Sequence, residues 1–135
     1  MKSPIILLVE DNEDDMYLTR RALSKAGLKS VFDVTDGQEA VDYIQGGRKY
    51  SDRTVWPFPD IILLDLKIPE ISGHEVAEWI KSRPEYDSCL VYILSSSGET
   101  RDRDRAIASS QGYFVKPLTA AHIETICQHF QDTES

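Results

Sequence analysis

Residues 61–65 read IILLD, an uninterrupted apolar run that ends on a carboxylate. Two similar runs lie at residues 5–9 (IILLV) and 90–94 (LVYIL). Strands that are buried on both faces have this composition, which is typical of the centre of a parallel sheet. Weaker strands are predicted over residues 31–35 and 113–115. The sequence therefore predicts five strands, of which three are central.

Between these strands, apolar residues recur every three or four positions, as on one face of a helix. The residues that define these faces are Leu18, Ala22 and Ala26; Ala40, Val41 and Ile44; Val76, Ala77 and Ile80; and Ile123, Ile126, Cys127 and Phe130. Strand and helix alternate five times, which predicts an α/β fold. Because crossovers between parallel strands are right-handed, we expect a three-layer, doubly wound (βα)5 parallel sheet with helices on both faces.

Residues typical of helix ends support this reading. The pairs with capping-box spacing are Ser72 with Glu75 and Ser96 with Glu99. The glycines placed to end helices in the left-handed conformation are Gly27 and Gly112. One long irregular stretch, residues 46–59, joins the second helix to the third strand and is expected at the amino-terminal end of the sheet.

The length of 135 residues predicts a single domain over residues 1–135, with a polar tail that frays at about 131–135. Twenty-three acidic residues against fifteen Lys and Arg give a net charge of −8, which disfavours nucleic acid and anionic membranes as direct partners. Cys89 and Cys127 lie far apart without metal-ligand spacing, so neither a disulfide nor a zinc site is expected. The absence of a signal peptide or apolar span favours the cytoplasm.

Polar residues follow the strands at the carboxyl end of the sheet, where open parallel sheets form their sites. They are Glu10, Asp11, Asp65, Ser95 and Lys116. Oxygen-only ligands favour a hard cation such as Mg²⁺, with Mn²⁺ as a substitute. A lysine and a serine hydroxyl facing that ion are suited to a phosphoryl group. Asp65 is the best candidate for the nucleophile, because a carboxylate can form an acyl phosphate.

The chain resembles the receiver domains of two-component response regulators, the CheY-like family of flavodoxin-like folds. The matching stretches are ILLVEDNEDD (6–15), IILLDLKIPEISG (61–73), VYILSSSGE (91–99) and GYFVKPL (112–118). The resemblance implies the strand order 2-1-3-4-5. The long loop and the VEDNEDD start most resemble small stand-alone receivers that work with bacterial phytochromes.

The resemblance also assigns roles to individual residues. It implies phosphorylation on Asp65 and a metal ion held by Glu10, Asp11, Asp65 and the backbone carbonyl of Lys67. It implies Ser95 and Lys116 as phosphoryl contacts, Ser95 and Tyr113 as switch residues, and a cis peptide bond between Lys116 and Pro117. Ser95 stands where threonine is also common in the family.

We therefore expect a phosphorylation-switched signalling module and not an enzyme that turns over external substrates. A sensor histidine kinase would donate the phosphoryl group, and the output would be protein binding, with homodimerisation through the fourth helix, fifth strand and fifth helix. One alternative is a phosphorylation-independent interaction module with the same fold. Another is a magnesium-dependent aspartyl-phosphate phosphohydrolase, which Lys67 disfavours because such enzymes usually carry a general acid at that place.

Several residues receive a structural interpretation instead. His74, His122 and His129 are expected to be solvated, and the alternating run RDRDR (101–105) is expected to form a solvated, weakly held helix. Trp56 and Phe58 are expected to fold back onto the domain.

Overall fold

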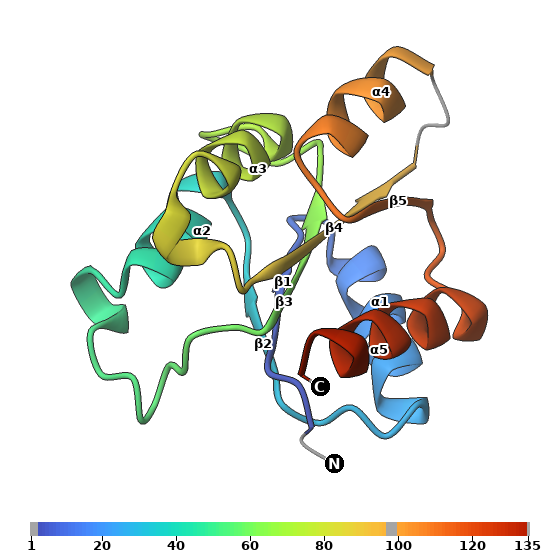
Figure 1. Cartoon of the computed structure of the whole chain (residues 1–135), viewed down its shortest axis with the longest axis horizontal. Coiled ribbons are helices and arrows are strands. Elements are labelled where there is room, and N and C mark those ends of the chain that lie inside the picture. The colour runs from blue at the N-terminus through green and yellow to red at the C-terminus, as the bar shows by residue number, and fades with distance from the viewer. Residues whose placement is uncertain (1–2, 97–99, 135) are drawn as a thin grey trace.

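The computed structural model describes residues 3–96 and 100–134, which form a parallel sheet of five strands between two layers of helices (Figure 1). The strand order is β2-β1-β3-β4-β5. The strands are β1 (Ile6–Val9), β2 (Val31–Val34), β3 (Ile61–Asp65), β4 (Leu90–Ser95) and β5 (Gly112–Val115). The fold class predicted from the sequence and the strand order that the resemblance implied are both confirmed.

The two faces of the sheet carry separate apolar cores. On one face, α1 (Glu13–Lys25) and α5 (Ala120–Glu134) pack against the sheet, whereas α2 (Gly37–Gln45), α3 (Gly73–Lys81) and α4 (Thr100–Ala108) lie on the other (Figure 1). Residues of β1, β3 and β4 are buried throughout, because alternate side chains enter the two cores. The edge strands β2 and β5 are partly exposed.

Side-chain caps begin three of the helices. Asn12, Asp36 and Ser72 accept hydrogen bonds from backbone N–H groups in the first turns of α1, α2 and α3. The Ser72 hydroxyl also donates to Glu75 Oε1 at 3.0 Å, so the two side chains of the predicted capping box are in contact. The second predicted box cannot be compared, because Glu99 lies outside the described residues.

The two glycines predicted to end helices behave differently. Gly27 has a φ of +83° just after α1, as expected. The prediction for Gly112 is wrong, because this residue begins β5. A Cβ atom at Gly112 would approach the Tyr92 ring to 3.0 Å, so close packing against β4 is the reason for glycine there.

The predicted inner face of α1 is wrong at two positions. Leu18 and Ala26 are exposed, and Thr19 and Leu23 are buried instead. Leu18 and Ala26 have helical spacing, and so do Thr19 and Leu23. The second pair looked less apolar in the sequence because it includes a threonine, so the first was predicted to face the core. Residues 131–134, which were predicted to fray, form the last turn of α5, and their fraying stays a prediction.

The long stretch between α2 and β3 is anchored by aromatic packing. It contains a short 3-10 helix, η1 (Arg48–Tyr50), and its Trp56 ring packs edge-on against Tyr43 and Tyr50, with centroids 6.2 and 5.3 Å apart. Phe58 stacks on Tyr86 at 5.7 Å. The prediction that Trp56 and Phe58 fold back onto the core is confirmed.

The RDRDR run is exposed as predicted at every residue except Asp102, which is half-buried, and a series of polar contacts also joins α4 to α3. Arg105 forms two hydrogen bonds of 2.9 Å with the carboxylate of Glu78. His74 Nε2 lies 3.4 Å from Asp102 Oδ1, and Lys81 Nζ donates to the carbonyl of Ala108. Residues 74, 78 and 81 thus face residues 102, 105 and 108 turn by turn.

We expect the Arg105→Ala substitution to loosen α4, because among its residues 101–108 Ala106 alone belongs to the buried core of that face. Hydrogen exchange of the α4 amides should become faster at low salt, and the difference from the unmodified chain should shrink at 1 M salt as the ion pair is screened. Arg103→Ala, a change of equal charge at an exposed position of the same helix, is the control. Equal exchange in the two variants would contradict a role for the Arg105–Glu78 pair.

The prediction that the three histidines are solvated is wrong. His74 is buried, with Nδ1 lacking a hydrogen-bond partner among the described residues. His129 Nδ1 lies 2.5 Å from the Tyr92 hydroxyl, and the His122 ring stacks on Phe114 at 4.4 Å. The His122 and His129 imidazoles pack as aromatic rings, which sequence spacing did not reveal.

Two other expectations concern the cysteines and membrane-spanning helices. Cys89 and Cys127 are both free thiols, Cys89 being buried. No helix in the described parts of the chain is long and apolar enough to cross a lipid bilayer.

Candidate functional site

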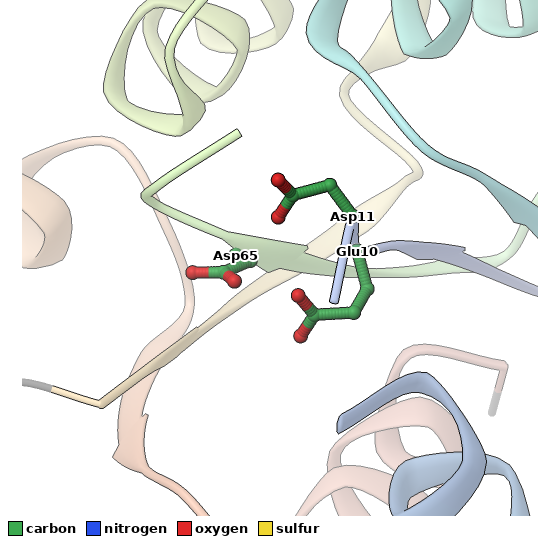
Figure 2. A group of neighbouring side chains, drawn as sticks. All are labelled: Glu10, Asp11 and Asp65. Carbon is green, nitrogen blue, oxygen red and sulfur yellow. The ribbon is translucent and has the colours of Figure 1, made fainter. Parts of the chain in front are cut away.

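Three carboxylates meet at the carboxyl ends of β1 and β3. The two strands are adjacent, with Val9 opposite Leu64, so the residues that follow them lie side by side. One oxygen each from Glu10, Asp11 and Asp65 lies within 4.8 Å of the other two. Figure 2 shows these side chains leaving the strand ends next to one another. The sequence prediction that these acids converge is thus matched by the geometry.

The acids differ in their surroundings. Glu10 and Asp65 are buried, whereas Asp11 is exposed. Asp65 Oδ1 accepts a hydrogen bond of 3.1 Å from the backbone N–H of Lys67, and Glu10 Oε2 accepts one of 3.2 Å from Asn12. Burial, together with the neighbouring Asp65 carboxyl, raises the pKa of Glu10 to about 7 despite the opposing effect of Lys116. The cluster therefore favours a nearby cation.

Lys116 supplies positive charge at this site. Its Nζ lies 2.5 Å from Glu10 Oε1, 2.8 Å from Asp15 Oδ2 and 3.0 Å from Asp65 Oδ2. Burial by itself would lower the pKa of Lys116, but the hydrogen bonds to Asp15, Glu10 and Asp65 outweigh it and raise the pKa above its usual value. Lys116 is therefore a fixed ammonium group with all three N–H donors directed at carboxylates.

Backbone contacts fix the position of this lysine. Its N–H donates to the carbonyl of Ser95 at 2.8 Å, which ties the end of β5 to the end of β4. The peptide bond from Lys116 to Pro117 is cis, as the resemblance implied.

The other predicted site residues occupy neighbouring positions. Ser95 is buried at the end of β4, one residue beyond the pair formed by Leu94 and Asp65. Tyr113 lies on β5 opposite Ile93, half-buried against the core under α2, α3 and α4. The Lys67 side chain is exposed, although its N–H is bonded to Asp65.

Sequence reasoning missed two residues of the site. Asp15, on the first turn of α1, contacts Lys116 although it was not predicted to have a role. Gly73 lies so close to the strand end that a Cβ atom there would be 2.2 Å from the carbonyl oxygen of Asp65. The run of acids over residues 10–15 was a signal for Asp15, but helix-start preference explained it equally well.

The chemistry of the donor set fits a hard divalent cation. Three carboxylates without nitrogen or sulfur ligands are the groups that Mg²⁺ and Mn²⁺ accept. Their closeness without such an ion is costly, and in this structure Lys116 provides compensation.

Fold and site together define a doubly wound α/β protein with an acidic, lysine-containing crevice at the carboxyl ends of its strands. The chain belongs to the response regulator receiver domain family, whose model matches residues 6–128. Members of this family are signalling modules of two-component systems that are phosphorylated on an aspartate, and not enzymes in the ordinary sense.

Known relatives cover nearly the whole chain. The bacteriophytochrome response regulator AtBRR is 34% identical, with a TM-score of 0.83 over 97% of this chain and 94% of that one. The Mn²⁺-bound form of response regulator Rcp1 is 27% identical, with a TM-score of 0.77 over 95% and 91%. The probable methanogenesis regulatory protein FilR2 of Methanothrix harundinacea is 31% identical over 95% of this chain and 81% of its own. Relatives of similar identity thus serve different signalling processes.

Proposed function

We propose that this chain accepts a phosphoryl group on Asp65 from a sensor histidine kinase and signals through phosphorylation-dependent protein binding. The observation that carries the proposal is the contact of the Lys116 ammonium with Asp65, 3.0 Å apart, beside the Glu10 and Asp11 carboxylates. Asp65 is buried on a central strand, so its position is fixed by the sheet.

The transfer forms one bond and breaks one. An oxygen of the Asp65 carboxylate attacks phosphorus of a phosphohistidine, the P–N bond breaks, and the histidine leaves and takes up a proton from water. The product is an acyl phosphate on Asp65, which hydrolysis later returns to aspartate and inorganic phosphate. Lys116 donates a hydrogen bond to a phosphoryl oxygen, and the Ser95 hydroxyl donates another.

A metal ion is part of the proposal. Glu10, Asp11 and Asp65 would hold Mg²⁺, together with the backbone carbonyl of Lys67, and Mn²⁺ could replace it. When bound, the ion supplies positive charge that offsets the negative charge on the transferring phosphoryl group. The Mn²⁺-bound form of a relative supports the binding of a divalent ion.

Ser95 and Tyr113 are proposed to carry the signal away from Asp65. Ser95 would move towards the new phosphoryl group, and Tyr113 on the adjacent strand would turn inward. These two movements would change the surface of α4, β5 and α5. That surface exposes Ile107 and Val115, which are 48% and 45% accessible, and we propose it as the site of homodimerisation.

A phytochrome is our proposed source of the phosphoryl group. The similarity to AtBRR over almost the full length of both chains supports this link. The similarity to FilR2 shows that the same fold and comparable identity also occur in a regulator of another process, so the kinase must be identified by phosphotransfer.

The test is incubation with acetyl phosphate and Mg²⁺, followed by intact mass measurement and size-exclusion chromatography. The unmodified chain should gain the mass of one labile phosphoryl group. This gain should not occur when EDTA replaces Mg²⁺ in the incubation, and the Asp65→Asn variant should show no gain in either condition. A chain that gains no mass, or gains it equally in Asp65→Asn, would favour a phosphorylation-independent interaction module. Continuous release of phosphate at a high rate would instead favour a phosphohydrolase. A mass gain without a change in elution would remove the dimer from the proposal and leave phosphorylation in place.

A further inference from the structure

One contact at the site comes from a carboxylate outside the group of possible metal ligands. Asp15 Oδ2 lies 2.8 Å from Lys116 Nζ, closer than Asp65 Oδ2 at 3.0 Å. In the described parts of the chain, the group that could hold a metal ion comprises Glu10, Asp11 and Asp65 and leaves Asp15 outside. Asp15 therefore contacts the lysine and lies outside the group of possible metal ligands.

The backbone holds Asp15 in place for this contact. Its N–H donates to the side chain of Asn12, the N-cap of α1, at 2.9 Å. Acidic residues at a helix start often serve only to stabilise the helix dipole, and Glu13 and Asp14 on the same turn are also placed to do so. Of these three first-turn acids, Asp15 is the one with an ion pair to Lys116.

We propose that Asp15 is a positioning residue that retains one N–H of Lys116 on the α1 side of the site and thereby limits the positive charge that the lysine delivers to a phosphoryl group on Asp65. This inference rests on the proposed function. Lys116 has three N–H donors, shared among Glu10, Asp15 and Asp65. Phosphorylation changes the charge of Asp65, and a bound metal ion engages Glu10, whereas Asp15 remains available to the lysine in each state.

The Asp15→Asn substitution should have effects of opposite sign on two ligands. With one negative charge removed, Lys116 is freer to contact an anion, so beryllofluoride, an analogue of the phosphoryl group, should bind about two- to fivefold more tightly at saturating Mg²⁺. Mg²⁺ alone should bind more weakly, because Lys116 then turns more fully to Glu10 and Asp65 and competes with the ion. Both effects should shrink with added salt, since the Asp15 side chain is 37% exposed.

Asp14→Asn is the matched control, because it removes the same charge from the exposed neighbouring residue. Both affinities are measured by titration calorimetry, and the Lys116 ammonium resonance is followed by NMR. That resonance should shift in Asp15→Asn and stay in place in Asp14→Asn. Asp15→Glu, which restores the charge, should move both affinities back towards those of the unmodified chain.

The outcomes separate this inference from the proposed function. If the unmodified chain binds neither Mg²⁺ nor beryllofluoride, the proposed function is wrong. The inference about Asp15 is then wrong as well, even if the Lys116 ammonium resonance shows that Asp15 contacts the lysine. If the unmodified chain binds both but Asp15→Asn matches Asp14→Asn, the inference alone is overturned. Weaker binding of both ligands in Asp15→Asn would also overturn it, because this result indicates a loosened site and not a redirected lysine.

Discussion

Replacing Lys116 with methionine is expected to slow phosphorylation by acetyl phosphate on the order of 100-fold, the usual cost of removing one group that stabilises charge in a transition state. Lys116 Nζ lies 3.0 Å from Asp65, the lysine side chain is 12% exposed, and no other ion pair to Asp65 is found among the described residues. Affinity for Mg²⁺ should rise in the same variant, because the ammonium group no longer competes for Glu10 and Asp65. The rate is followed by intact mass and the affinity by calorimetry.

Two further variants separate this effect from a general loss of structure. Lys25→Met removes the same charge from an exposed position near the end of α1 and should change neither quantity appreciably. Lys116→Arg keeps the charge and should preserve the thermal stability. The planar guanidinium group is a poor substitute for the compact ammonium group of lysine, so the rate of phosphorylation should still fall. A Lys116→Met variant that is phosphorylated at the normal rate would show that the lysine is not part of the transfer.

Replacing Gly73 with alanine is expected to lower the free energy of unfolding by about 3 kcal/mol and to displace the acceptor aspartate. A Cβ atom at residue 73 would lie 2.2 Å from the carbonyl oxygen of Asp65 and 2.6 Å from the Cα atom of Leu66. Both neighbours are backbone atoms, one at the end of β3 and one in the loop that follows it, and the N–H of Gly73 also donates to the carbonyl of Leu66. Relief of the clash therefore requires movement of the start of α3 or the end of β3.

The measurements for Gly73→Ala are urea unfolding and Mg²⁺ affinity. Gly47→Ala is the matched control, because the nearest atom to its Cβ would be the Asp42 carbonyl oxygen at 4.0 Å and its φ of −94° suits any residue. That variant should unfold within about 0.5 kcal/mol of the unmodified chain. Equal stability of the two alanine variants would show that α3 is not packed against β3 as described.

The sheet and the acids at its strand ends follow from local sequence. The runs at residues 61–65 and 90–94 are typical of central strands of a parallel sheet, and a residue that ends such a strand must lie at the carboxyl edge. Glu10, Asp11 and Asp65 could therefore be grouped before their distances were known, and their chemical type already indicated a hard cation. The strand order came from the family resemblance, since apolar runs alone do not say which strands are neighbours.

Tertiary structure alone decided which side chains share a partner. The apolar stripe of α1 had two possible phases, and only packing against β1 and β3 buried Thr19 and Leu23 in place of Leu18. The pairing of α3 with α4 through Glu78 and Arg105, like the contact of Asp15 with Lys116 across 101 residues, depends on the angle at which separate elements meet. Strand position is set by hydrophobic pattern along the chain, whereas the direction of a charged side chain is set by whatever the fold brings opposite to it.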